Sequence, residues 1–190
     1  WAGARGYGIQ APYSLAADIV RALWGQGGDD LKATADAQAH AAALADLLGT
    51  ADPGEDWQRL APLQRRERLE AAFVWLVGEQ ARRQPLALLV EDVFLADERS
   101  QRLIASLAQR LAAQPLLLMM SYRPDFAPRW RDEPWFDEQA LGPLPPAEAA
   151  RLADHLMGSD ASLALVRGAL LERAAGNPLF LEQMVMTLLD

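Results

Sequence analysis

Two short apolar runs place the strongest constraint on how this chain can fold. The first covers Leu86–Val90 and follows Pro85, and the second covers Leu116–Met120 and follows Pro115. Neither run alternates apolar with polar residues, which is typical of strands covered on both faces in a parallel sheet. The segment between them, 98–113, carries apolar residues at helical spacing. Strand, helix and strand with short links predict a right-handed βαβ unit.

Helices are predicted to precede this unit. Ser14 can cap a helix over 15–23, and the Ala-rich segment 31–48 has high helix propensity. A third helix is predicted over Pro62–Arg83, where apolar residues repeat along one face. Residues 1–13 are rich in Gly and small residues, which indicates an irregular loop. The expected fold class is therefore α/β, a parallel sheet with flanking helices.

The last third of the chain has a different character. A short strand is predicted near 139–141, and the Pro-rich junction 142–146 follows it. Beyond this junction the sequence predicts only helices. We therefore predict two parts, an α/β core over 1–141 and a small all-helical subdomain over 142–190.

Charge and composition exclude several classes of protein. The 190 residues carry a net charge of −8, which disfavours direct binding to nucleic acid because the phosphate backbone requires a cationic face. There is no cysteine, so disulfides and thiolate metal sites are excluded, and a reducing compartment, the cytoplasm, is expected. No apolar run approaches the ~18 residues that a membrane-spanning helix needs, so we expect no membrane partner.

Charged residues follow both predicted strands. Glu91 and Asp92 follow the first strand, and Arg123 comes shortly after the second. Ligands of open parallel sheets bind beyond the carboxyl ends of the strands. Neighbouring residues that leave a strand point to opposite sides, so one carboxylate can hold Mg²⁺ while the other polarises a water. The alternative is that the acids only mark where the chain leaves the core, and that Arg123 is an ordinary surface residue.

Two other motifs have local explanations. Asp97 and Glu98 place negative charge where a helix is predicted to begin, which favours the helix dipole. Gly176-Asn177-Pro178 is typical of a helix that ends at Gly and is followed by a helix that Pro opens.

Taken together, several segments resemble the ATPase module of the signal-transduction NTPases, the STAND class of AAA-related P-loop proteins. They are, in order, GIQAPYSLAADIVRAL, LALLVEDVFLAD, LLLMMSYRPDF, LGPLPPAEAARL and RAAGNPLFLEQMV. The variant most like this chain is found beside bacterial class III nucleotide cyclases and in large LuxR-type regulators. The resemblance implies a partial P-loop NTPase parallel sheet with flanking helices, followed by a small all-helical lid subdomain.

The resemblance also implies roles for single residues. Glu91 and Asp92 match the Walker B acids, which coordinate Mg²⁺ and activate the attacking water. Arg123 matches the polar end of the sensor strand, near the terminal phosphate. Pro178 matches the proline of the lid's Gly-x-Pro motif, which lies against the adenine. ATP and Mg²⁺ would then be cofactors of a parent protein whose partner is an attached effector domain or another protein.

The chain departs from the family at two places. The family often has His-Trp-Ala-Asp after its acids, whereas 93–97 keeps only Ala-Asp. No G-x-x-x-x-G-K-[ST] phosphate loop occurs, and the chain begins at Trp1, so we expect a fragment whose loop lies upstream. This fragment alone is expected to bind nucleotide weakly or not at all, with no tightly bound cofactor. The alternative is a non-catalytic, helix-rich protein-interaction module; an exposed sheet edge makes an oligomer possible.

Overall fold

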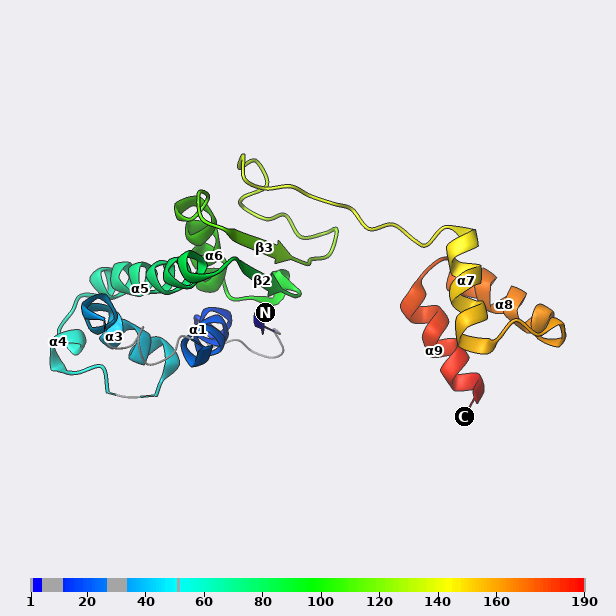
Figure 1. The fold of residues 1–190 in the computed structure, drawn as a ribbon, viewed down its shortest axis with the longest axis horizontal. Helices are drawn as coiled ribbons and strands as arrows, with labels where there is room; N and C mark the ends of the chain where they lie inside the picture. The colour runs from blue at the N-terminus through cyan, green and yellow to red at the C-terminus, as the bar shows by residue number, and fades with distance from the viewer. Residues whose placement is uncertain (1, 5–11, 27–33, 51, 190) are drawn as a thin grey trace. The chain divides into compact units, whose positions relative to one another are not determined.

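The computed structural model describes residues 2–4, 12–26, 34–50 and 52–189, drawn as a ribbon in Figure 1. They form two compact units, Trp1–Asp137 and Glu138–Asp190, which are described separately. Helices account for most of the described residues. The strand predicted near 139–141 is wrong, because the chain has no regular structure there.

The first unit contains a small parallel sheet with the strand order β1-β2-β3. Its strands are β1 (Ala2–Ala4), β2 (Leu86–Val90) and β3 (Leu116–Met120). β2 and β3 have the bounds predicted from the sequence, and Leu86 pairs with Leu116. β1 lies in a segment for which an irregular loop was predicted, and it pairs with β2.

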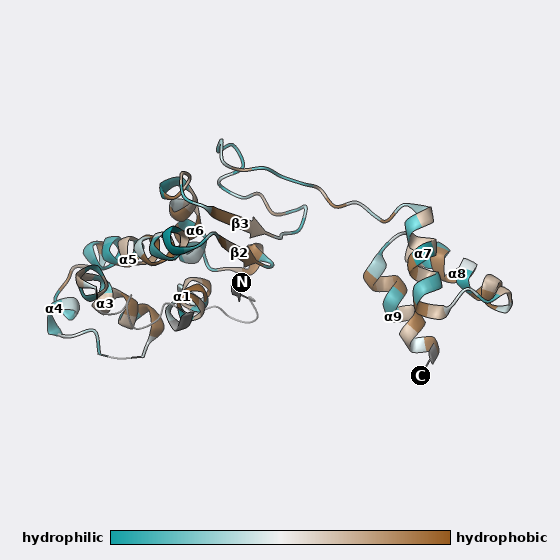
Figure 2. Cartoon of the chain, viewed as in Figure 1, coloured by the Kyte–Doolittle hydropathy of each residue, from teal (hydrophilic) through white to brown (hydrophobic). Residues whose placement is uncertain are grey.

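The expected fold class, an α/β P-loop NTPase sheet followed by a helical lid, is wrong. Most of the described residues are helical, and within them the sheet consists of one strand of 3 residues and two of 5 residues. The sheet is also covered less than expected, because Leu117 is 57% exposed and Met119 is 53% exposed. Figure 2 shows both β2 and β3 in the colour of hydrophobic residues. An apolar run predicts a strand, but whether a layer covers its second face depends on other segments of the chain.

The first unit is built mainly from helices. Those that the structure describes are α1 (Ser14–Gln26), α3 (Ala35–Leu48), α4 (Glu55–Gln58), α5 (Pro62–Arg83), the 3₁₀-helix η1 (Val93–Leu95) and α6 (Glu98–Arg110). Phe73 and Val77 of α5 are fully buried in one core with Leu88 of β2 and Ile104 of α6. In the described part of the chain, no helix combines the length and the apolar character needed to cross a membrane.

Helix α5 has the bounds that the sequence predicts, and its ends have local causes. Pro62 occupies the first turn, where a missing N–H is tolerated. The side chain of Gln64 reaches back and accepts a hydrogen bond from the backbone N–H of Ala61 over 3.1 Å. The helix ends before Gln84, which precedes Pro85 and has an extended backbone, because a residue before proline disfavours the helical conformation.

The second unit is held by its own small core. Its helices are α7 (Pro146–Met157), the 3₁₀-helix η2 (Ala161–Leu163), α8 (Ala164–Ala174) and α9 (Pro178–Leu189). The buried residues that join them are Ala153, Leu170, Ala174, Leu181 and Val185. The partly buried residues that pack against this core are Leu152, Leu156, Met157, Leu171 and Met184.

Candidate functional site

The carboxyl ends of β2 and β3 form one continuous hydrogen-bonded edge. The backbone N–H of Ser121 donates to the carbonyl of Val90 over 3.0 Å, and the N–H of Val93 donates to the carbonyl of Ser121 over 2.9 Å. The Ser121 hydroxyl also accepts a hydrogen bond from the N–H of Asp92 over 2.9 Å. Parallel pairing therefore brings the Glu91–Asp92 pair to the same edge as the residues that follow β3.

Asp92 has an unusual backbone at this edge. Its φ is 53° and its ψ is 47°, which is the left-handed region. Only a few per cent of non-glycine residues adopt it, and such conformations concentrate at functional sites. The carbonyl of Asp92 accepts the N–H of Leu95 over 2.8 Å and so begins η1. The expectation that Glu91 and Asp92 point to opposite sides assumed an extended backbone, and the turn at Asp92 removes that basis.

Both carboxylates of the pair are exposed to solvent. Among the residues that the structure describes, no group of three or more His, Cys, Asp or Glu side chains is arranged to hold a metal ion. Mg²⁺ is usually bound through one or two carboxylates, with substrate phosphates and waters as its other ligands. Glu91 and Asp92 therefore suit Mg²⁺ only as part of a complex to which a phosphate ligand contributes.

Arg123 lies at the same edge but is placed by an aromatic ring. Its guanidinium carbon is 4.9 Å from the centre of the Phe94 ring, a cation–π contact between the segments that follow β3 and β2. Its carbonyl accepts the N–H of Phe126 over 3.0 Å, which closes a turn after the strand. The side chain is exposed, so the guanidinium donors remain accessible while the ring limits their movement.

Pro178 belongs to the second unit, where its local role is clear. It is the first residue of α9, and it follows Asn177, whose side chain accepts the N–H of Phe180 over 3.1 Å. Gly176 has φ 78°, and a Cβ there would lie 2.7 Å from the carbonyl oxygen of Leu144. The local explanation of the Gly-Asn-Pro motif is confirmed, and the role of Pro178 toward adenine stays a prediction.

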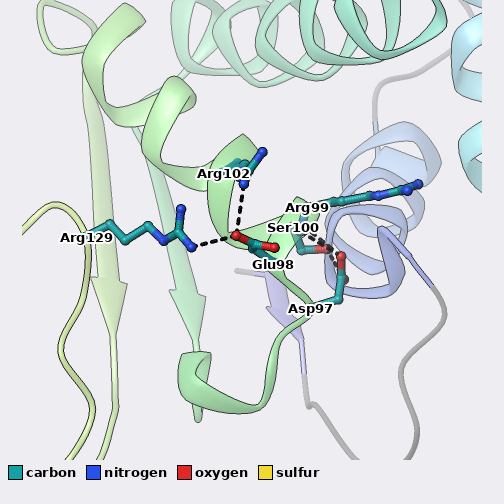
Figure 3. A network of polar contacts seen from close by, with 6 residues as sticks. All are labelled: Asp97, Glu98, Arg99, Ser100, Arg102 and Arg129. Atoms are coloured by element: carbon teal, nitrogen blue, oxygen red, sulfur yellow. Dashed lines mark hydrogen bonds and ion pairs between the residues drawn. The ribbon is translucent and has the colours of Figure 1, made fainter. Parts of the chain in front are cut away.

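A second polar network links the segment before α1 to the start of α6, and the sequence only partly indicated it. Asp97 caps α6, as the negative charge at this helix start predicted, and accepts the N–H groups of Arg99 and Ser100. The same carboxylate accepts the N–H of Tyr13, from the segment before α1, over 3.0 Å. Figure 3 shows Asp97 and Ser100 side by side, where the Ser100 hydroxyl donates to Asp97 over 2.6 Å.

This network changes the acidity of Asp97. Partial burial alone would raise the pKa of its carboxyl group. The hydrogen bonds from the Ser100 hydroxyl and from the N–H groups of Tyr13, Ser100 and Arg99 outweigh burial and lower the pKa below its ordinary value. Asp97 is thus an ionised structural acid, and no substrate group is needed to explain it.

Comparison with known proteins identifies one similar sequence of unstated role. A protein of Rhizobium meliloti (strain 1021), described as uncharacterized, is 32% identical over 126 residues, which cover 65% of this chain and 12% of that protein. The chain therefore spans much less than two thirds of the relative that it matches. No family model matches the sequence. No solved structure matches it either.

Proposed function

We propose that this chain is part of a larger ATP-binding regulatory ATPase, a signal-transduction switch that controls an attached effector. The observation that supports the proposal most is the hydrogen bond from the N–H of Asp92 to the hydroxyl of Ser121, which holds an acid in a left-handed turn at the carboxyl ends of two parallel strands. An exposed acid pair and an exposed arginine share this edge. The proposal rests on that chemistry and on the resemblance of the sequence segments, and it does not include the family's fold.

The edge residues have complementary tasks in this proposal. Glu91 and Asp92 would hold Mg²⁺ together with the nucleotide phosphates, and one of them would orient the attacking water. Bound Mg²⁺ would neutralise charge that develops on the phosphate oxygens. Arg123 would present its guanidinium to the terminal phosphate, because its contact with Phe94 leaves the donors accessible. The role of Pro178 in nucleotide binding is kept in this proposal as the sequence resemblance implies it.

The proposal places the activity in a longer protein of the cytoplasm. A backbone nest and a lysine that grip phosphates are parts of the proposed machinery that this sequence lacks. The chain by itself is therefore expected to bind ATP weakly or not at all. An ATP titration of the 190-residue chain that gave micromolar affinity would contradict this expectation.

The deciding experiment uses the full-length protein that contains this chain. Asp92→Asn keeps the size of the side chain and its local hydrogen bonds but removes the negative charge. We expect it to lower ATP turnover at least about a hundredfold, in line with the loss of a positioned catalytic group. Asp132→Asn, an exposed residue of the loop after β3, is the matched control and should leave turnover unchanged. Equal turnover in the Asp92 and Asp132 variants would remove Asp92 from the catalytic assignment.

A second candidate is a non-catalytic protein-interaction module. It is favoured by the surface of the second unit, where Leu165 is 90% exposed and Leu179 is 64% exposed. Phe180, Met186 and Leu188 of α9 are also exposed, and exposed apolar side chains of this kind are typical of partner surfaces. This function predicts that the full-length protein has no ATP turnover that depends on Asp92, and that Leu179→Ser with Phe180→Ser abolishes association with its effector.

A further inference from the structure

A hollow of about 650 Å³ opens in the first unit between the end of α3 and the beginnings of α5 and α6. Its volume lies within the range of small-molecule sites, ~300–1,000 Å³. Its lining includes four arginines, Arg65 and Arg66 of α5 and Arg99 and Arg102 of α6. Glu91, Asp92 and Arg123 do not line it, so it is a different place from the strand-end edge.

Within the described residues, three of these four arginines hold no carboxylate, and one of the three, Arg65, is engaged by the backbone, because its Nε donates to the carbonyl of Leu60 over 3.1 Å. In the described part of the chain, neither Arg66 nor Arg99 makes an ion pair. The guanidinium of Arg99 instead lies over the ring of Tyr13, with 5.6 Å to the ring centre. Both side chains are exposed. A guanidinium presents a planar fork of donors that matches phosphate and carboxylate oxygens, so two unpaired forks at one hollow favour an oxyanion.

Two of the three acids of the hollow, Glu98 and Glu70, are already paired with arginines. Figure 3 shows Arg102 and Arg129 both pointing at Glu98, with Arg99 extending away from it. Glu98 accepts these guanidiniums over 2.9 Å and 2.5 Å. Glu70 is paired with Arg110 over 3.0 Å and accepts the Ser106 hydroxyl. With Arg110 and Arg129 included, six arginines face three carboxylates at this place, in a chain whose net charge is −8.

The third carboxylate, Asp46, and the apolar floor of the hollow limit the chemical class of ligand that the hollow can bind. Asp46 lines the hollow and makes no ion pair in the part of the chain that the structure describes. It therefore disfavours a ligand that is anionic along its whole length. Leu69 and Leu103 form a buried apolar floor, and Leu63 is 59% exposed in the lining. The hollow thus combines a cationic side with apolar surface.

We propose that this hollow binds a small soluble phosphate monoester that carries an apolar or aromatic group. Arg66 and Arg99 bind its phosphate oxygens, and the organic group lies on Leu69 and Leu103. The α5 N-terminus adds to the attraction, because Ala61, the residue just before the helix, provides no side-chain acceptor for the first N–H groups. The function of the site is recognition of the ligand, with no covalent step.

Phenyl phosphate is the probe that tests the proposal, with inorganic phosphate and benzoate as comparison ligands at equal ionic strength. Isothermal titration of the 190-residue chain should give saturable binding of phenyl phosphate that is at least tenfold tighter than that of either comparison ligand. The double variant Arg66→Ala, Arg99→Ala should weaken phenyl phosphate binding about tenfold to a hundredfold, the effect of losing charge-assisted hydrogen bonds.

The matched control is Arg21→Ala, Arg82→Ala, which removes the same charge from two surface ion pairs outside the hollow. It should keep the affinity within about twofold, because distant exposed charges are screened by salt. If the double variant does not fold, the single variant Arg66→Ala decides, since this exposed side chain makes no ion pair. Absence of saturable binding by the unmodified chain, equal loss in the control, or unchanged affinity without Arg66 would each overturn the proposal. Binding to phosphatidic-acid vesicles without binding of phenyl phosphate would also overturn it.

Discussion

The carboxylate of Asp97 accepts a hydrogen bond from the backbone N–H of Tyr13 over 3.0 Å, although the two residues are 84 positions apart in the chain. A further long-range contact runs from the N–H of Ala16 to the hydroxyl of Ser100, which is fully buried. The starts of α1 and α6 are thus joined by two neighbouring acceptors. These contacts connect two helices that are far apart in sequence.

The first prediction concerns the stability of this connection. Asp97→Ala removes the cap of α6 and the acceptor for Tyr13, and should lower the free energy of unfolding of the first unit by about 1–3 kcal/mol. Asp97→Asn keeps an acceptor at the cap, so it should lower the free energy of unfolding by about half as much as Asp97→Ala. All six tryptophans precede Glu138, so urea titration followed by tryptophan fluorescence reports on the first unit. An alanine variant as stable as the wild type would show that the connection contributes nothing.

The second prediction concerns the pH dependence of the same group. The pKa of Asp97 is lower in the folded chain than its ordinary value of 3.8, so the folded state binds fewer protons than the unfolded state near that pH. The ionised Asp97 carboxylate therefore adds to the free energy of unfolding. This contribution is present in full above about pH 5 and is lost as the pH falls through the folded-state pKa. The stability difference between the wild type and Asp97→Asn should be constant from pH 7 to about pH 5 and should shrink below pH 3.8. A difference that stays constant into strong acid would contradict the lowered pKa.

Much of the local structure follows from the sequence. The bounds of β2, β3 and α5 were predicted correctly because Pro85 and Pro115 separate apolar runs from helical patterns. β1 was missed because Ala2–Ala4 has no strand character of its own and forms by pairing with β2. The sheet as a whole was predicted wrongly, since the sequence pattern does not say which segments cover the exposed side of β3.

The sequence predicts which residues share the candidate site, but it does not predict their long-range hydrogen bonds. Parallel pairing of two predicted strands is enough to place Asp92 and Arg123 at one edge. The left-handed backbone of Asp92 occurs together with a hydrogen bond to the hydroxyl of Ser121, which is distant in sequence, and no local pattern indicated it. The Tyr13 contact of Asp97 was missed for the same reason, although the capping role of Asp97 was clear from its position before a helix.

The third prediction separates backbone strain from chemistry at Asp92. Glycine adopts a φ of 53° without a Cβ conflict, whereas alanine does not. Asp92→Gly should therefore be more stable than Asp92→Ala by about 1 kcal/mol. Both variants lack the carboxylate, so both should lose the ATP turnover proposed for the full-length protein. Urea unfolding measures the first effect and turnover the second. Equal stability of the two variants would mean that the left-handed turn is not retained in solution.

The fourth prediction tests the Gly-Asn-Pro turn of the second unit. A Cβ on Gly176 would lie 2.7 Å from the carbonyl oxygen of Leu144 and 2.9 Å from Pro143, and the backbone has φ 78°. The N–H of Leu144 also donates to the carbonyl of Gly176 over 2.8 Å, so the turn cannot move away without losing this bond. Gly176→Ala should destabilise the second unit by about 2 kcal/mol or more.

Gly168→Ala is the matched control for that substitution. Gly168 lies inside α8 with nothing within 4 Å of an added Cβ, so alanine there should stabilise the helix by about 0.5–1 kcal/mol. Tryptophan fluorescence does not report on the second unit, so hydrogen exchange of the α9 amides is the appropriate measurement. Exchange should become faster in Gly176→Ala and slower in Gly168→Ala. If both substitutions slow exchange, the close approach of 143–144 to the turn does not hold the second unit together, and the small core around Leu181 must carry its stability alone.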